Sequence, residues 1–278
     1  MKRFLFATDL HGHLPSYRAL FARAREEAVA GVWLGGDLLP HSSGGGAGPV
    51  RQQRRFLSET LRPELVALAE AGVALSGVLG NDDWAAVEPT LLQLEQEGLF
   101  RSLHGRVQEL GEGLWLAGYS GVPLTPFRMS DWDRLDELGW EPRRVAERLL
   151  FSEGDEVREG SLAEVRARPT IAAELAALAE RLPAPRQTVL LAHSPPYATA
   201  LDRMHGGASI GSRALRRWIE THQPLLTLHG HVHESPRLSG AIEDRLGDTR
   251  CFNPGDSRRR LRALQVTLGP GFVAVEPA

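Results

Sequence analysis

The strongest constraint on the fold of this chain is a series of short apolar segments, each followed closely by a polar residue. The segments are residues 4–7, 32–34, 73–79, 189–192 and 225–228, and the residues that follow them are Asp9, Asp37, Asn81, His193 and His231. Short apolar runs between turn signals are typical of buried β-strands. Because ligands of open α/β sheets bind at the carboxyl ends of the strands, we expect these polar residues to gather there.

The segments between these strands carry helical signals. Helices are predicted at residues 16–28, 51–71 with an interruption at Pro63, 171–182 and 212–221. Ser161 and Glu164 have the spacing of a capping box, and Ser212 is placed to cap the last of these helices. The tail, residues 235–275, is predicted to form several short strands. Together these elements indicate an α/β fold.

Composition excludes several functional classes. The formal net charge is −3, which argues against general binding to nucleic acids or to acidic membranes. Cys251 is the single cysteine, so a disulfide within the chain and a cysteine-rich metal site are both excluded. No apolar stretch approaches the roughly 20 residues of a membrane span. The apolar run near the N-terminus is too short for a signal peptide, so a cytoplasmic location is expected.

The 278 residues are predicted to form one domain, residues 1–278. Chains of this length with α/β folds often do so. Residues 119–186 lie between two predicted strands, and we interpret them as a partly helical insertion because the segment is short. The glycine-rich loop 41–49 directly follows the Asp37 segment and is expected near the polar cluster. The oligomeric state stays open.

Five clusters carry the chemistry: Asp9-Leu10-His11, Gly36-Asp37, Gly80-Asn81-Asp82-Asp83, Ala192-His193 and Gly230-His231-Val232-His233. Residues two apart in an extended chain point to the same side, so each D-x-H or H-x-H pair can face one pocket. The donors are oxygen atoms and imidazole nitrogens, which suit Mn, Fe, Co, Ni or Zn and do not suit Cu(I). Each residue alone is explained by a cap, a turn or a core histidine, but all seven in this order favour a metal site.

The order D-x-H, G-D, G-N-x-D, H and G-H-x-H resembles the calcineurin-like metallophosphoesterase family, from Asp9 to His233. The turn at Asn253, Pro254 and Gly255 is similar to one near the C-terminus of many bacterial members. The resemblance implies a four-layer α-β-β-α sandwich of two mixed sheets with metals at one edge. It also implies two divalent metal ions, for which manganese is favoured and iron, zinc, nickel and cobalt are alternatives.

The resemblance also implies a role for each ligand. The first metal would be bound by Asp9, His11 and His233, and the second by Asn81, His193 and His231. Asp37 would bridge the two metals with one carboxylate oxygen to each, and a bridging hydroxide would complete the site. Two metals about 3.5–4 Å apart acidify a shared water and stabilise an in-line displacement at phosphorus.

Asp82 departs from the family pattern, because many members carry a histidine after the asparagine. That histidine is assigned to transition-state stabilisation or to protonation of the leaving group, although branches with another residue exist. We take Asn81 and Asp82 as the catalytic candidates. Asp82 would act as a general acid only if its pKa were raised, and otherwise it orders water or a ligand. Pro40 replaces a second acidic residue of the family, which is not a metal ligand.

Further histidines are expected near the substrate. His13 and His41 lie close in sequence to the first two clusters, and His205 lies in the loop between His193 and His231. We assign His205 and His13 to substrate binding, with His41 as a further candidate. His229 directly precedes the last cluster and is interpreted as a strand end.

The predicted function is hydrolysis of a phosphodiester in a small phosphorylated substrate by attack of a metal-bridging hydroxide. The alternatives are a phosphomonoesterase, a nucleotide pyrophosphatase, or a non-catalytic metal-binding scaffold of the same fold. Scaffold members typically lose several ligands, whereas all seven positions are filled here. A zinc protease or a deaminase is not indicated, since the sequence has no H-E-x-x-H motif and no paired cysteines.

Overall fold

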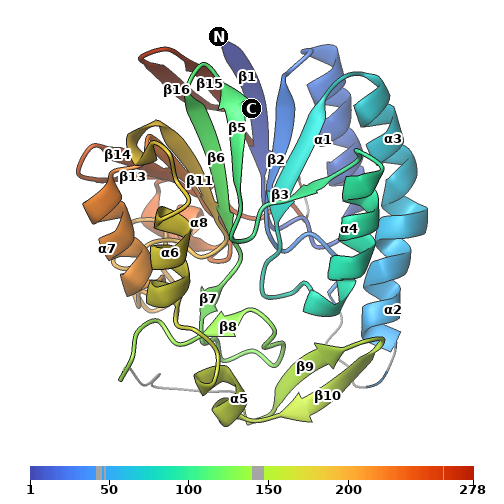
Figure 1. Cartoon of the computed structure of the whole chain (residues 1–278), viewed down its shortest axis with the longest axis vertical. Coiled ribbons are helices and arrows are strands. Elements are labelled where there is room, and N and C mark those ends of the chain that lie inside the picture. The colour runs from blue at the N-terminus through green and yellow to red at the C-terminus, as the bar shows by residue number, and fades with distance from the viewer. Residues whose placement is uncertain (42–45, 47, 140–146, 259) are drawn as a thin grey trace.

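Two six-stranded mixed sheets lie face to face at the centre of the molecule (Figure 1). The computed structural model describes residues 1–41, 46, 48–139, 147–258 and 260–278. The first sheet has the order β16 (Phe272–Pro277), β15 (Ala263–Gly269), β1 (Lys2–Ala7), β2 (Gly31–Gly35), β3 (Ala74–Val78) and β4 (Arg101–Ser102). The second has the order β13 (Glu243–Leu246), β14 (Thr249–Phe252), β12 (Leu226–Leu228), β11 (Thr188–Ala192), β6 (Leu114–Tyr119) and β5 (Val107–Gly111).

The inner strands of both sheets are parallel, and their carboxyl ends meet at one edge of the sandwich. In the first sheet β1 pairs with β2 and β2 with β3, all in parallel. In the second, β11 is parallel to β6 and β12, and β12 is parallel to β14. His193, directly after β11, donates a hydrogen bond to the carbonyl of Gly35 at the end of β2. The expected gathering of strand ends is therefore present.

Alternate residues of each inner strand enter different parts of the core. Phe4 and Phe6 of β1 pack between the two sheets, where Phe4 stacks on Trp33 with ring centroids 4.2 Å apart. Leu5 and Ala7 of the same strand face the outer helices. Because these strands are covered on both faces, their sequences read as continuous apolar runs and do not alternate with polar residues.

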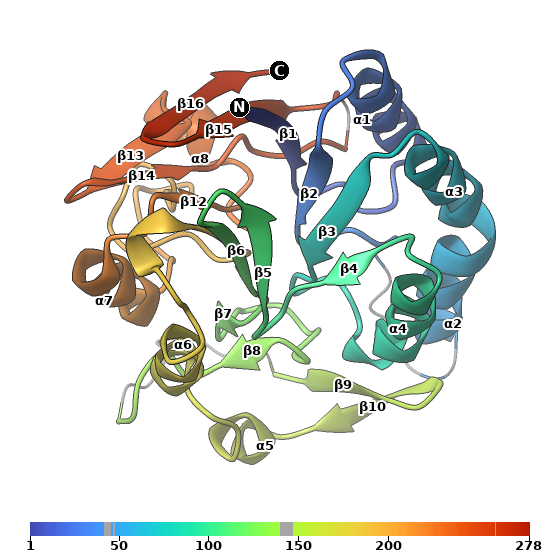
Figure 2. The same ribbon diagram turned by 45° about the horizontal axis from the view of Figure 1, so that its top comes forward.

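Helices cover the outer faces of both sheets and complete the predicted four layers, as the second view of the ribbon also shows (Figure 2). The first sheet is covered by α1 (Leu14–Glu26), α2 (Gly48–Arg55), η1 (Phe56–Leu61), α3 (Arg62–Glu70), η2 (Ala85–Val87) and α4 (Glu88–Gln96). The second sheet is covered by α6 (Ile171–Ala179) and α7 (Arg213–His222). The remaining short helix of the C-terminal part is α8 (Ser235–Ser239).

Two helices show how local chemistry sets their ends. The hydroxyl of Ser212 accepts a hydrogen bond from the amide of Leu215 at 2.9 Å, as predicted for the cap of α7. The predicted interruption at Pro63 is absent, because α2, η1 and α3 follow each other without a gap. The segment η1 is a π-helix, and a widened turn before a proline is one way in which a helix accommodates the ring and its missing amide hydrogen.

The expected insertion, residues 119–186, divides into two parts. Its first part contains the pair β7 (Val122–Pro123) and β8 (Asp133–Arg134), the hairpin β9 (Leu149–Glu153) and β10 (Glu156–Gly160), and α5 (Leu162–Arg166). The predicted capping box is present at the start of α5. The second part, α6 and η3 (Pro185–Gln187), returns the chain to the second sheet, and α6 packs on that sheet beside α7. The sequence did not predict the hairpin.

Two expectations concern the remaining segments. Of the glycine-rich loop predicted at 41–49, residues 42–45 and 47 lie outside the described residues. Within the described part of the chain, no helix has both the length and the apolar character needed to cross a membrane.

Candidate metal centre

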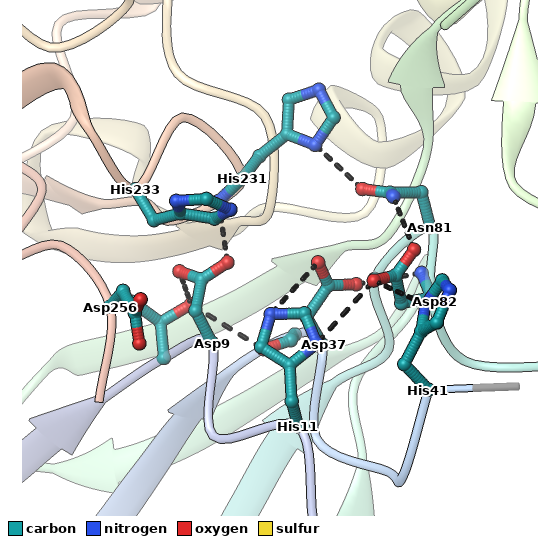
Figure 3. Close-up of polar contacts among 12 residues, drawn as sticks. Asp9, His11, Asp37, His41, Asn81, Asp82, His231, His233 and Asp256 are labelled. Atoms are coloured by element: carbon teal, nitrogen blue, oxygen red, sulfur yellow. Dashed lines mark hydrogen bonds and ion pairs between the residues drawn. The ribbon is translucent and has the colours of Figure 1, made fainter. Parts of the chain in front are cut away.

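The turns that follow five strands bring the predicted ligands together (Figure 3). Asp9 and His11 follow β1, Asp37 follows β2, Asn81 follows β3, His193 follows β11, and His231 and His233 follow β12. Most of these side chains are buried, and Asp9 and His193 have no exposed surface. A cluster of carboxylates and imidazoles removed from water needs a partner charge, which a cation would supply.

Four of these residues adopt the left-handed backbone conformation that non-glycine residues rarely use. Their φ angles are +53° for Asp9, +44° for His11, +51° for Asp37 and +65° for His231. Such conformations cost roughly 1–3 kcal/mol each and gather at functional sites. Backbone hydrogen bonds hold the turns in place: Asp9 N donates to Gly36 O at 3.0 Å, and His11 N donates to Asp37 O at 2.8 Å.

Asn81, His193 and His231 converge on one point. The Oδ1 atom of Asn81 lies 3.2 Å from Nε2 of His193 and 2.6 Å from Nδ1 of His231. Nδ1 of His193 donates to the carbonyl of Gly35 at 2.8 Å, which fixes the ring and leaves Nε2 to face the cluster. Burial, with His193 nearby, lowers the pKa of His231 to about 3, so this ring is neutral, as metal ligation requires.

Asp9, His11 and His233 form a second group on the other side of Asp37. The rings of His11 and His233 meet edge to face with centroids 6.3 Å apart. Burial raises the pKa of Asp9, and the two nearby histidines oppose only part of that rise. Neither ring nitrogen of His11 makes a hydrogen bond within the described part of the chain, although the side chain is almost buried. A buried imidazole with no hydrogen bond, whose ring nitrogens face the Asp37 and Asp82 carboxylates, suits a metal ligand.

Asp37 lies between the two groups. Its Oδ1 is 3.4 Å from Nε2 of His193, and its Oδ2 is 3.9 Å from Nε2 of His11. Burial alone would raise the pKa of Asp37, but the His193 and His11 rings hold that pKa well below its ordinary value. Burial would lower the pKa of His193, but the Asp37 and Asp9 carboxylates raise it to about 9. The Asp37 and Asp9 carboxylates thus stabilise a positive charge beside His193, and a divalent cation would supply that charge.

The glycines before the ligands allow the turns to approach each other. A Cβ atom on Gly80 would lie 2.6 Å from Nε2 of His193 and closer still to the Asp37 carboxylate. A Cβ atom on Gly36 would lie 2.7 Å from Cγ of His193. These distances are well below ordinary van der Waals contact, so a side chain at either position would displace the ligands.

Several buried polar residues hold the turns that carry the predicted ligands but are not predicted ligands themselves. Nδ2 of Asn253, in the turn after β14, donates to the carbonyls of Gly230 and Val232 on either side of His231, both at 3.2 Å. The ring of His229 donates to the carbonyls of Ala192 and Ser194, which supports its interpretation as a strand-end residue. The Asp83 carboxylate accepts hydrogen bonds from the amides of Leu38, Leu39 and Gly80 and joins the turns after β2 and β3.

The opening of the site is lined by charged residues. The Asp82 side chain is 16% exposed, and its Oδ2 lies 2.9 Å from Nδ1 of His41, whose side chain is 53% exposed. Arg258 pairs with Asp256, and the charges of Asp9 and Asp82 act on its guanidinium group. The sequence predicted the turn around Asn253, but it did not predict that Arg258, a few residues later, pairs with Asp256 beside the metal centre.

The rings of the two residues assigned to substrate binding contact other side chains. Nδ1 of His13 contacts the hydroxyl of Ser16 at 2.9 Å, at the start of α1. Nε2 of His205 lies 3.1 Å from Nη2 of Arg237, on an exposed loop. Among the described contacts, neither ring touches the seven ligands. The ring of His41, by contrast, contacts Asp82 beside the predicted ligand Asn81.

The donor set fits divalent metal ions. One oxygen each from Asp9 and Asp37 and one nitrogen from His193 lie within 4.8 Å of one another, a spacing that a single ion can span. Carboxylate, amide and imidazole ligands suit Mn²⁺, Fe²⁺, Co²⁺, Ni²⁺ and Zn²⁺. The ring nitrogens of His11, which make no hydrogen bond within the described part of the chain, and the strained turns agree with this chemistry.

Comparisons with known proteins agree with the geometry. The model of one protein family, described as calcineurin-like phosphoesterase, matches residues 2–235. The fold is similar to that of the protein TT1561 of Thermus thermophilus, with a TM-score of 0.59, 19% identity, and 99% of this chain and 98% of that chain covered. It is also similar to a dimetal phosphatase from Danio rerio, with a TM-score of 0.56, 12% identity, and coverage of 99% and 95%. The comparison with curated proteins gives no match.

Proposed function

This chain belongs to the calcineurin-like phosphoesterase family, and we propose that it is a phosphodiesterase that uses two divalent metal ions, with manganese as the first choice. The observation that carries the proposal is the position of Asp37. Its two carboxylate oxygens face different groups of ligands, one near His193 and the other near His11. This geometry supports a bridging role for Asp37 between two ions.

In this proposal Asp9, His11 and His233 hold one ion, and Asn81, His193 and His231 hold the other. When bound, the two ions would activate a water molecule as the nucleophile and offset the charge of the phosphate. The protein residues keep the ligands in place before the substrate arrives. Hydrogen bonds from His193 to Gly35 and from Asn253 to Gly230 and Val232 fix the rings and turns, so little reorganisation accompanies the reaction.

The charge at the opening favours a diester over a monoester. A phosphodiester carries one negative charge, whereas a monoester near neutral pH carries up to two. The Asp82 carboxylate lies at the opening, next to Asn81, and repels the more highly charged substrate more strongly. Phosphomonoester hydrolysis is the second candidate, because one structure with a similar fold is a dimetal phosphatase.

A panel of substrates and metals tests the proposal. The chelator-treated protein is loaded separately with Mn²⁺, Fe²⁺, Co²⁺, Ni²⁺ or Zn²⁺ and assayed with a phosphodiester, a phosphomonoester and a nucleotide pyrophosphate. We expect the highest kcat/KM for the diester in the manganese-loaded protein. A clear preference for the monoester would favour the second candidate. Binding of two ions without turnover of any substrate would favour the non-catalytic scaffold.

A further inference from the structure

Asp82 faces the metal centre with one carboxylate oxygen. Its Oδ2 lies 3.4 Å from Nδ1 of His11, and Nε2 of the same ring lies 3.9 Å from Oδ2 of Asp37 (Figure 3). One ligand atom from each of these three residues lies within 4.8 Å of the other two, which is a spacing that a single ion can span. Within the described part of the chain, this set and the set of Asp9, Asp37 and His193 have only Asp37 in common.

The His11 ring is the observation that points to a cation in this set. Its side chain is 6% exposed, and neither ring nitrogen makes a hydrogen bond within the described residues. A buried polar group left without a hydrogen bond costs roughly 1–3 kcal/mol. A cation between His11, Asp37 and Asp82 would satisfy the ring and offset the charges of the two carboxylates.

Hydrogen bonds hold the Asp82 carboxylate in this direction. Its Oδ1 accepts from Nδ2 of Asn81 at 3.0 Å, and its Oδ2 accepts from Nδ1 of His41 at 2.9 Å. Its backbone amide donates to Oδ1 of Asp37 at 2.8 Å, and its carbonyl accepts from Nε2 of the buried Gln53 at 2.8 Å. Carboxylates that bind metals are themselves hydrogen-bonded, and each oxygen has two lone pairs. Oδ2 can therefore accept from His41 and bind an ion at the same time.

We propose that Asp82 is a ligand of the ion that His11 and Asp37 hold, in addition to the seven ligands proposed above. This inference deepens the proposed function and rests on it. A further carboxylate makes the donor set of this ion richer in oxygen, which suits Mn²⁺ and weakens the preference for Zn²⁺ that imidazole ligands give. It also lowers the positive charge that the centre offers to a substrate, which agrees with a singly charged phosphodiester.

Manganese binding by Asp82→Asn tests this assignment, because the amide keeps the shape of the carboxylate and loses its charge. Chelator-treated protein is titrated with Mn²⁺ in a calorimeter. We expect two ions in the wild type, and a Kd at least about 10²-fold weaker for one of the two ions in Asp82→Asn. His41→Ala removes only a hydrogen-bond partner of the ligand and should weaken that ion less, since such partners contribute roughly 10–100-fold. Asp248→Asn, at an exposed aspartate, is the matched control and should bind both ions as the wild type does.

A crystal structure of the manganese-loaded wild type separates a ligand from a positioning residue and does not depend on whether any variant folds. With the ions located by anomalous scattering, we expect Oδ2 of Asp82 at a bonding distance of roughly 2.0–2.3 Å from one of them. Two bound ions with Oδ2 beyond bonding distance of both, or unchanged Kd values in Asp82→Asn, would overturn the proposal.

Turnover of the substrate panel is measured on the same loaded protein, so that the two proposals fail separately. Wild-type protein that binds two ions, one of them through Asp82, and hydrolyses no substrate would refute the proposed function while supporting the ligand assignment. Hydrolysis of the diester without a bond from Asp82 to either ion would refute the ligand assignment alone. Fewer than two ions in the wild type at saturating manganese would overturn both.

Discussion

Replacing Gly80 by alanine adds one methyl group at the point where three turns of the metal centre touch. The new Cβ would lie 2.6 Å from Nε2 of His193, whereas ordinary contacts begin at 3.4 Å. The ring must therefore move by about 0.8 Å, or the turn that carries Asn81 must move by a similar distance. The Asp37 carboxylate meets the same methyl group, so no single side chain can resolve the overlap.

A displacement of this size has a calculable effect on catalysis. A misplacement of about 1 Å costs on the order of 10²-fold in rate, which corresponds to roughly 2.7 kcal/mol in the activation free energy. The overpacking itself should reduce the free energy of unfolding by about 1–3 kcal/mol. We therefore expect Gly80→Ala to fold, to bind manganese more weakly, and to lose about two orders of magnitude in kcat/KM.

The assay compares Gly80→Ala with a matched glycine variant. Gly48, at the start of α2, has open space around its Cβ position, so Gly48→Ala should keep wild-type activity. Metal content is measured by mass spectrometry after dialysis, and turnover is measured with a chromogenic phosphodiester at saturating manganese. Wild-type metal content and wild-type kcat/KM in Gly80→Ala would refute the reasoning that close approach of these turns builds the site.

Three further predictions concern other parts of the structure. His231→Ala removes a buried proposed ligand next to Asn81 and should abolish both metal loading and hydrolysis, whereas full activity would contradict the ligand assignment. Gln53→Ala leaves two carbonyls and one amide without their partner and should lower the free energy of unfolding by about 1–3 kcal/mol for each unsatisfied group, measured by chemical denaturation. Burial raises the pKa of Asp133 from 3.8 to about 8, so the folded protein keeps a proton that the unfolded chain releases, and stability falls as the pH rises through that interval. Asp133→Asn removes this dependence, and its advantage in melting temperature should grow from pH 4 to pH 8; a constant difference would contradict the assignment.

Much of the fold was predictable because its signals are local. Each inner strand is a short apolar run, and each proposed ligand lies within a few residues of a strand end, so the sequence predicted that these side chains gather. The capping box at Ser161 and the cap at Ser212 were equally local and are confirmed. The hairpin of β9 and β10 was not predicted, because its strands are short and its register depends on contacts with neighbouring segments.

The residues that position the site were harder to predict, since their roles arise only in three dimensions. Gln53 lies in the middle of a helix and has no motif, yet it joins the turns that carry His41 and Asp82. His13 and His205 were chosen by closeness in sequence; their rings contact Ser16 and Arg237, and their assignment to substrate binding stays a prediction.

The most direct test of the central claim is the metal content and activity of Asp37→Asn. The carboxylate of Asp37 faces both groups of ligands, and the amide that replaces it keeps the shape but loses the charge. Asp248→Asn, at an exposed aspartate, is the matched control. With manganese at equilibrium, we predict two ions per chain in the wild type and the control, fewer than one in Asp37→Asn, and no measurable hydrolysis by that variant. Two bound ions and wild-type turnover in Asp37→Asn would contradict the account.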